Sequence, residues 1–468
     1  MHLPLRVGLV PLYVEYYETV VPGIQATKLA LIEKAKRAIG GEYDLTVFDP
    51  VRGVEAARLT RASLLDGGFD CLIVLPLVAT FSQLSDELVQ GWRKPLLLLS
   101  AMAGTRLPHT MTMTRAVAES QSFGSQAIAN GWMRQGIRFK ALHLSLNSVE
   151  VEGALQQWLR VQECLVRTRT LRIGLIGEVF GGMTDVLLPA KQFEEHAGAA
   201  VVPIPMRCVH AAMRETTSEE LQNLEGELRK QFAWGRFSAQ EKNFSLRAAV
   251  AIRKLVGEKK LDCAAFNSHG PEGLQSRDLG LMAALGITLA TTSGCPMAEV
   301  GDLCTAFAMW LGRRLSGASY YTELDSAYMS EHEWFLLNSG EYDLSWLRPG
   351  VKARLVRNTN FAGKNGRGVS ICAPLRQGSA TILNFTPTPN ADSPYRIQYC
   401  EGKILKKWHQ EMGVGNARFE IPGSASRAYG QWLEAGPVHH SATCPGHLGP
   451  ALSDFCEAMG WTTLEVRG

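Results

Sequence analysis

The chain has 468 residues, of which 46% are hydrophobic and 20% are charged, and its 48 basic and 45 acidic side chains give a formal net charge of +3. This composition is typical of a globular protein and argues against a disordered or fibrous chain. The near balance of charges argues against a polyanionic partner such as nucleic acid. The length exceeds that of a single core and predicts roughly two to four domains.

The N-terminal residues 1–6 lack the basic start, long apolar run and small-residue cleavage site of a signal peptide. No apolar run reaches the roughly 18 residues that a membrane span needs. The ten cysteines are scattered, and no pair has the CxxC spacing of a zinc ribbon or a thioredoxin-type motif. We therefore expect a cytoplasmic protein with reduced, mostly buried thiols and no membrane segment.

The first part of the chain alternates apolar strands with helices. A long amphipathic helix is expected over about 24–38, and apolar strands are expected at 6–10, 44–48, 71–76 and 94–100. Continuous apolar strands separated by helices are typical of a parallel sheet that is covered on both faces. This pattern predicts an N-terminal Rossmann-like domain over residues 1–168, which ends in a helix near 153–168.

The same pattern then recurs. Residues 172–176 resemble the first strand, and residues 261–263 resemble residues 69–71. A strand at 200–204 and a charged helical stretch from 218 to 259 lie between them. We therefore predict a second Rossmann-like domain over residues 169–345.

From about Arg348 the chain changes to short alternating strands, such as 351–356 and 380–385, separated by Gly, Pro and Asn. This predicts a mostly antiparallel β domain over residues 346–468, a small barrel or sandwich, with a helix at 452–459 and a strand at 462–466. The predicted fold class is α/β, with two Rossmann-like doubly wound parallel-sheet domains and a C-terminal, mostly antiparallel β domain.

Candidate functional residues begin in the segment 293–302, which leads into a helix. Asp302 is a suitable N-cap, an apolar stripe follows over 303–315, and Gly317 can end the helix. Glu299 is therefore expected in a loop at a helix N-terminus. A carboxylate at such a place is either catalytic or a solvated capping group.

A second acid, Glu323, lies in a β-prone segment, and two adjacent histidines, His439 and His440, lie close to Pro and Gly near the C-terminus. Pro and Gly predict a turn, which can aim both imidazoles into one pocket. Two carboxylates and a histidine are donors that suit Mn²⁺ or Mg²⁺. Adjacent histidines also occur on solvated loops, where they have no functional role. His269, which follows the predicted strand at 263, is likewise either a functional polar contact or a loop histidine without a role.

Over nearly its whole length the chain resembles the L-arabinose and L-fucose isomerase superfamily, most closely the arabinose-isomerase-like branch. The resemblance is carried by Leu12-Tyr13, 171–177, 182–185, 301–315, Thr322-Glu323, Gly340-Glu341 and 436–440. It implies two Rossmann-like domains with a C-terminal β domain, and a homo-oligomer, usually a trimer or hexamer. It also implies interconversion of aldoses and ketoses with a divalent metal, typically Mn²⁺, held by two acids and two histidines.

Carried over to this sequence, the resemblance implies Glu299 and Glu323 as acid/base groups and metal ligands, with His440 as a further ligand and His439 beside it. Two positions depart from the family. Val300 separates Glu299 from the Gly-Asp pair that it directly precedes in the family, and Asn338 stands where the family has its other histidine ligand. An Asn carbonyl binds transition metals less well than an imidazole does, so metal affinity should fall.

The candidate substrate contacts are spread over the sequence. They are Tyr13, Glu15, Met183, His269 and His439. In the family that the chain resembles, the first domain has a polar residue, usually Gln or His, directly before a Gly. Here Phe123 precedes Gly124, and Gln121 lies nearby.

Three functions remain open from the sequence. The first is aldose–ketose isomerisation of a free or modified sugar through a metal-stabilised enediolate. The second is a different sugar-processing activity, such as that of a metal-independent epimerase or lyase, and the third is non-catalytic sugar binding. Asn338 and Val300 favour the second and third, whereas Glu323 and the histidine pair favour the first and second.

Overall fold

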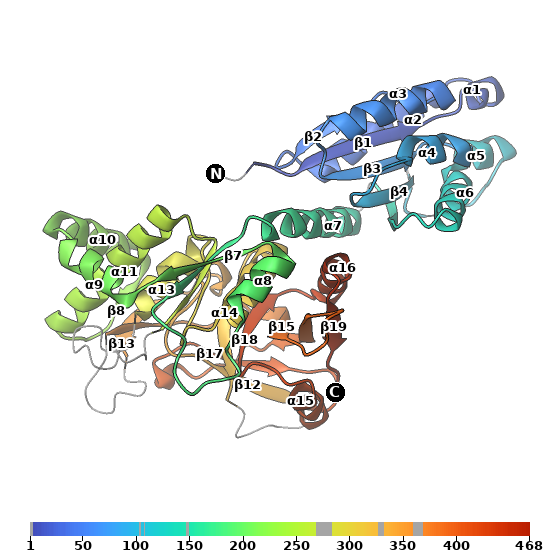
Figure 1. The fold of residues 1–468 in the computed structure, drawn as a ribbon. Helices are drawn as coiled ribbons and strands as arrows, with labels where there is room; N and C mark the ends of the chain where they lie inside the picture. The colour runs from blue at the N-terminus through green and yellow to red at the C-terminus, as the bar shows by residue number, and fades with distance from the viewer. Residues whose placement is uncertain are drawn as a thin grey trace. The chain divides into compact units, whose positions relative to one another are not determined.

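The structure is a computed structural model, which describes residues 3–102, 104–106, 108–146, 149–267, 283–325, 332–358 and 368–468. The chain divides into two compact units, Met1–Val166 and Arg167–Gly468, and each has its own hydrophobic core (Figure 1). Within the described ranges, no helix is long and apolar enough to cross a membrane. All ten cysteines are free, and all except Cys208 are buried, as expected.

The first unit is built on one parallel sheet. Its elements are β1 (Arg6–Leu12), α1 (Tyr16–Val20), α2 (Ile24–Ile39), β2 (Asp44–Val47), α3 (Val54–Asp66), β3 (Cys71–Pro76), α4 (Ser82–Val89), β4 (Leu96–Met102), α5 (Met113–Ala118), α6 (Gln121–Arg134), β5 (Lys140–Ser145) and α7 (Val149–Thr168). The strand order is β2-β1-β3-β4-β5, and every pair is parallel.

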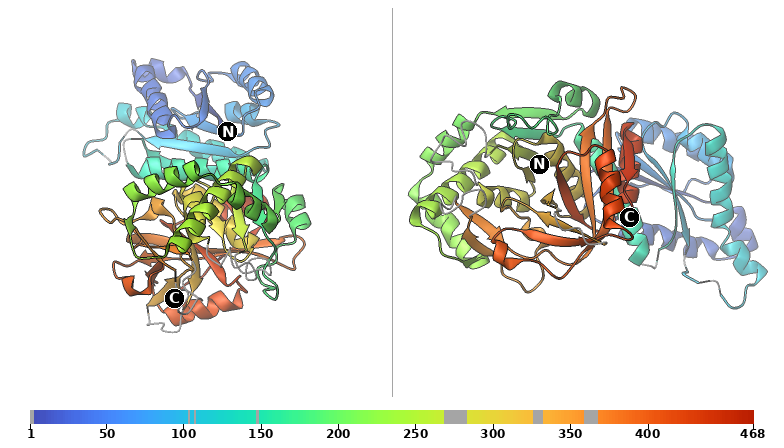
Figure 2. Two further views of the ribbon diagram at one scale, coloured as in Figure 1. Left: turned by 90° about the vertical axis from the view of Figure 1, so that its left-hand side faces the viewer. Right: turned by 90° about the horizontal axis from the view of Figure 1, so that it is seen from below.

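Helices cover both faces of this sheet (Figure 2). On one face, Leu97 and Leu99 of β4 share a core with α2 and α7, and on the other face Leu98 shares a core with Trp132 of α6. All six residues of β3 are buried, which explains its continuous apolar sequence.

The second unit opens with another parallel sheet. Its first elements are β6 (Arg172–Ile176), α8 (Ala190–Ala197), β7 (Ala200–Ile204), α9 (Met206–Glu215), α10 (Ser218–Gln231), β8 (Ala233–Trp234), α11 (Ala239–Lys259), β9 (Cys263–Phe266), α13 (Ala284–Thr292), β10 (Met297–Ala298) and α14 (Leu303–Ser316). The four-stranded sheet has the order β10-β9-β6-β7. The long charged stretch is two helices, because Thr217 and Ser238 each form a capping box that begins a new one.

The rest of the second unit is mostly antiparallel. It contains β11 (Tyr320–Leu324), β12 (Glu333–Leu337), the 3₁₀ turns η1 (Leu344–Trp346) and η2 (Gln410–Met412), β13 (Arg354–Arg357), β14 (Val369–Cys372), β15 (Gly378–Pro387), β16 (Tyr395–Ile404), β17 (Asn416–Glu420), α15 (Ala425–Glu434), β18 (His440–Pro445), α16 (Gly449–Met459) and β19 (Thr462–Glu465). The main sheet has the order β15-β18-β11-β12-β17-β16-β19. Because β15 also pairs with β16, the sheet closes into a barrel-like form.

The predicted combination of parallel-sheet parts with an antiparallel part is confirmed. The expected boundary near residue 345 does not separate the sheets, however. β11 and β12 precede it and already belong to the barrel-like sheet, and β8 pairs with β13 from the region beyond it. The reason is that β11 follows α14 directly, as a strand in a helix–strand repeat would, so the sequence pattern resembles that of the parallel sheet.

Candidate functional site

The pairing of β11 with β18 brings together residues that lie far apart in the sequence. Glu323 is opposite His440, and Tyr321 is opposite Ala442. Side chains alternate between the two faces of a strand, so Tyr321, Glu323 and His440 project from the same face. On the other face, the hydroxyls of Thr322 and Thr443 share a hydrogen bond of 2.7 Å.

His440 lies between two carboxylates. Its Nδ1 is 2.9 Å from Oδ2 of Asp302, and its Nε2 is 3.9 Å from Oε1 of Glu323. The side chains of His440 and Asp302 are 2% and 0% exposed, whereas that of Glu323 is 31% exposed. A carboxylate only accepts hydrogen bonds, so Nδ1 of His440 carries the proton.

Asp302 also begins helix α14. Its Oδ1 accepts a 2.9 Å hydrogen bond from the backbone N–H of Thr305, as an N-cap does. One carboxylate therefore both starts the helix and orients the imidazole of His440. The sequence predicted the first role and missed the second.

A buried loop after β12 supplies a third carboxyl. Asn338 organises this loop, since its Nδ2 donates to the backbone oxygen of Glu341 (2.8 Å) and its Oδ1 accepts from the N–H of Gly340 (3.1 Å). Burial, together with the nearby charge of Glu323, raises the pKa of Glu341 to about 8. Burial therefore favours the protonated form of Glu341.

Tyr321 lies at the centre of the group. Its ring centroid is 5.0 Å from that of His440, and among the described residues its buried hydroxyl has no hydrogen-bond partner. Burial raises its pKa well above the ordinary value, and the charges of nearby carboxylates add to this effect. These are Glu323, Glu341, Asp302 and Glu299. We call these four acids, with Tyr321 and His440, the acid–imidazole cluster.

The turn that carries Glu299 has an unusual backbone. Val300 and Gly301 both have positive φ, +53° and +76°, and the N–H of Asp302 donates to the oxygen of Glu299 at 3.0 Å. A β-branched residue rarely adopts positive φ, which often marks strain at a functional site. The turn accommodates the extra Val300 and keeps Glu299 buried, 1% exposed, near Tyr321.

Gly301 is required for the shape of this turn. A Cβ atom there would lie 2.8 Å from the backbone of both Glu178 and Val179, in addition to the cost of positive φ. We expect Gly301→Ala to lower the free energy of unfolding of the second unit by about 2 kcal/mol or more. Gly317→Ala is the matched control, because Gly317 has positive φ but open space around it. Urea unfolding of the two variants measures the difference in unfolding free energy. Equal losses would contradict the close approach of Gly301 to the backbone of Glu178 and Val179.

The two adjacent histidines have different environments. Their rings are 3.7 Å apart, but His440 is buried whereas the side chain of His439 is 44% exposed. Nδ1 of His439 is 2.6 Å from Oδ2 of Asp185. Burial opposes ionisation of Asp185, but hydrogen bonds from the ring and backbone N–H of His439 outweigh it and lower the pKa of Asp185. The two histidines were expected to point into one pocket, but only His440 belongs to the buried cluster, whereas His439 pairs with Asp185 at the surface.

The remaining candidate residues are Tyr13, Glu15, Met183 and His269. Tyr13 and Glu15 belong to the first unit, where the guanidinium of Arg52 lies 5.2 Å from the Tyr13 ring centroid and pairs with Glu15 at 3.2 Å. Met183 is half-buried in the loop that also carries Asp185. His269 lies outside the described residues.

In the first unit, the candidate position at Gln121 contacts a buried lysine. Nζ of Lys28 donates to Oε1 of Gln121 at 2.8 Å, and Lys28 is 4% exposed. Burial lowers the pKa of Lys28 from 10.5 to about 8. Between these pH values the unfolded chain binds more protons, so stability should rise with pH there.

We therefore expect the unfolding free energy of the native protein to rise, relative to Lys28→Met, by about 3 kcal/mol between pH 7 and pH 10.5. Urea denaturation of both proteins at the two pH values measures this change. The other lysines and tyrosines titrate in both proteins, so subtracting one unfolding free energy from the other removes their contribution. A constant difference between the two proteins would show that Lys28 titrates normally.

The metal site that the sequence resemblance implies does not fit the residues as they lie. Within the described ranges, no group of three or more His, Cys, Asp and Glu side chains is arranged to hold a metal ion. Both ends of the Asn338 amide are hydrogen-bonded to the backbone, and burial favours the protonated form of Glu341. The metal-ligand roles of Glu299, Glu323, His440 and Asn338 therefore stay a prediction, and no reaction step is derived through a metal.

No family model and no curated protein matches the chain. Among solved structures, it has a slight likeness to a periplasmic solute-binding protein of an ABC transporter from Actinobacillus succinogenes with bound D-allose. The identity is 13%, the match covers 66% of this chain and 91% of that one, and the TM-score is 0.16. A solute-binding protein from Agrobacterium vitis, bound with alpha-D-tagatopyranose, has 14% identity, coverage of 66% and 89%, and a TM-score of 0.14. Likeness at this level carries no argument about fold or function.

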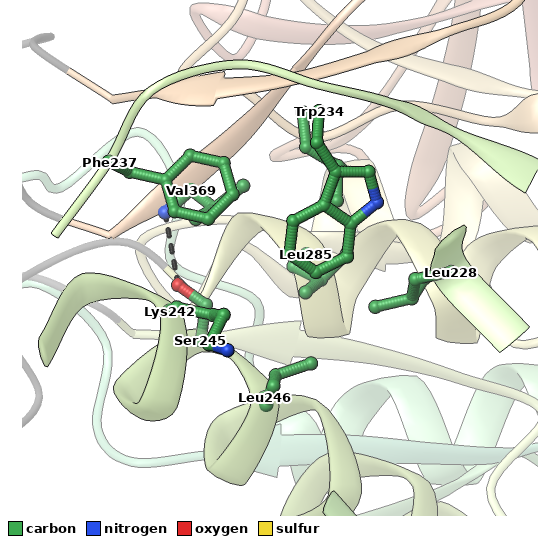
Figure 3. A pocket seen from close by; sticks show the side chains of 9 residues that line it. Leu228, Trp234, Phe237, Lys242, Ser245, Leu246, Leu285 and Val369 are labelled. Atoms are coloured by element: carbon green, nitrogen blue, oxygen red, sulfur yellow. Dashed lines mark hydrogen bonds between the residues drawn. The ribbon is translucent and has the colours of Figure 1, made fainter. Parts of the chain in front are cut away.

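A small, partly open pocket lies in a different part of the second unit (Figure 3). Its wall is mostly apolar, and the hydroxyl of Ser245 beside it accepts a 3.0 Å hydrogen bond from the N–H of Val369. The lining residues are Leu228, Trp234, Phe237, Lys242, Ser245, Leu246, Leu285, Leu355 and Val369. None of these residues belongs to the acid–imidazole cluster.

Sequence reasoning missed four residues of the site, Asp185, Asp302, Tyr321 and Glu341, in their roles here. A signal existed for Tyr321, because it is two residues from Glu323 and must share its face of the strand. Gly340-Glu341 was noted only as part of the family resemblance. No local signal in the sequence links Asp185 with His439.

Proposed function

We propose that this protein is an enzyme that moves protons between carbon and oxygen atoms of a small open-chain sugar, an aldose–ketose isomerase by reaction class. The observation that carries the proposal is the arrangement of three unlike groups on one site. Glu341, whose protonated form is favoured by burial, the accessible carboxyl group of Glu323 and the oriented imidazole of His440 all surround Tyr321. A proton donor and proton acceptors placed together are what proton transfer needs.

In the proposed reaction Glu323 is the base, since its side chain is the accessible one of the three. It takes a proton from C2 of the aldose and returns it to C1. Glu341 and Tyr321 can donate to the enediolate oxygens and stabilise the negative charge that forms there, while Nε2 of His440 accepts the proton of O2 and returns one to O1. Asp302 keeps the proton of His440 on Nδ1, so that Nε2 faces Glu323.

The family resemblance supports further parts of this proposal. It suggests that the parallel sheets of both units belong to Rossmann-like, doubly wound domains, and that the protein works in the cytoplasm as a homo-oligomer. It also favours a sugar as the substrate. The alternative of metal-independent chemistry is favoured by Asn338, because the backbone of its loop engages both ends of the amide.

The proposal is tested by product analysis. The purified protein, treated with a chelator or with Mn²⁺, is incubated with free aldopentoses and aldohexoses, and the ketoses are separated by chromatography. Formation of a ketose under either condition supports the proposal, and activity only with Mn²⁺ assigns the metal-dependent branch. If sugars bind but none is converted under either condition, the protein is a sugar-binding subunit instead.

A further inference from the structure

The acid–imidazole cluster has an excess of negative charge. In the part of the chain that the structure describes, Asp302 and Glu323 form their contacts with His440 and with a backbone N–H group, and neither pairs with Lys or Arg. Elsewhere in the same unit, buried or half-buried acids such as Glu241 and Asp343 pair with arginines. Buried charge needs a compensating charge, so the cluster is suited to a cation.

The positions of the acceptors show where such a cation would bind. Oε1 of Glu323 and Nε2 of His440 are 3.9 Å apart, which is too long for a direct hydrogen bond but suits a donor that contacts both. Within the described residues, Oε2 of Glu341 and the hydroxyl of Tyr321 are buried without hydrogen-bond partners. Buried polar groups are normally satisfied, so these two atoms point to a polar ligand at this place.

We propose that the cluster binds the positively charged amino group of its substrate, which would then be an amino sugar or a related polyhydroxylated amine. This inference rests on the proposed function, because it takes the cluster as the substrate site. An ammonium group offers three N–H donors, which match Glu323, His440 and either Glu341 or Tyr321. The substrate would then supply the cation at this place. A sugar phosphate would bring like charge to the same carboxylates and should bind poorly.

The test compares matched ligands that differ in one group. Binding of D-glucosamine, D-galactosamine and D-mannosamine is measured by isothermal titration calorimetry beside the parent hexose and the N-acetyl derivative of each. At least one amine should bind about tenfold or more tightly than both of its neutral counterparts. This preference should fall as salt is raised from about 50 mM to 500 mM.

Glu323→Gln should remove most of the preference, whereas Glu434→Gln, at an exposed position on α15, should retain it. If no amine in the panel binds more tightly than its neutral counterparts, the inference is overturned. A preference that persists in Glu323→Gln or that ignores salt also overturns it. If Glu323→Gln does not fold, the native protein alone tests the inference: its preference for the amine must fall as salt is raised.

The outcomes separate this inference from the proposed function. Preferential binding of an amine that is never converted would contradict the proposed function and leave the inference standing. Conversion of neutral sugars, without any preference for amines, would contradict only the inference.

Discussion

Replacing Glu323 by Gln should lower the rate of sugar isomerisation by about 10²- to 10⁴-fold. The amide has nearly the volume of the carboxylate but cannot take a proton from carbon. Glu323 is 31% exposed on its side chain and forms no short hydrogen bond in the described structure, so the fold should be retained. The measurement is the initial rate of ketose formation with saturating sugar.

The matched control for this substitution is Glu434→Gln, which makes the same chemical change at an exposed position of the same unit. Its rate should equal that of the native protein. Circular dichroism and thermal unfolding establish that both variants are folded. A folded Glu323→Gln protein with nearly native activity would remove Glu323 from the reaction.

The second large effect is expected for Asp302→Asn, which separates the two roles of this residue. The Asn oxygen can still accept from the N–H of Thr305, so helix α14 should keep its cap and the free energy of unfolding should change little. The amide is a weaker acceptor for Nδ1–H of His440 and can instead donate to that nitrogen, which favours the wrong tautomer. We expect the catalytic rate to fall by about 10²-fold or more.

Asp302→Ala is the informative companion variant. It loses both roles, so it should lose a similar factor in rate and also about 1 kcal/mol or more of stability. The pH dependence of the rate is the readout that a purely structural role would not change, and Asp302→Asn should shift its profile. A native rate in Asp302→Asn would show that His440 is oriented by other contacts.

The fold could be predicted wherever burial leaves a local pattern. The strands at 71–76 and 200–204 begin and end at the predicted residues. The first follows the charged Asp70, and the second lies between Gly198, which ends α8, and Pro205, which begins α9. The predicted N-cap at Asp302 and the Gly317 stop of α14 are also confirmed, since capping depends on a few adjacent residues. The position of β11 in the barrel-like sheet could not be predicted, because strand pairing joins residues more than a hundred positions apart.

The site was predictable only where the chemistry is local or the family resemblance covers it. Glu323 and His440 were both named from the sequence, and the structure pairs them across β11 and β18. The properties of Glu341 depend on burial from several loops, which no sequence pattern shows. The departure at Asn338 was visible, but its role in holding the loop backbone required coordinates.

The central claim is that Glu323, Glu341 and His440 form one site that transfers protons at a sugar carbon. Proton NMR of free sugars and amino sugars incubated with the native protein in D₂O tests it most directly. The account predicts that the C2 hydrogen of at least one of them is replaced by deuterium at a rate that depends on Glu323. Sugars that bind to the folded protein and are recovered with every carbon-bound hydrogen intact would contradict it.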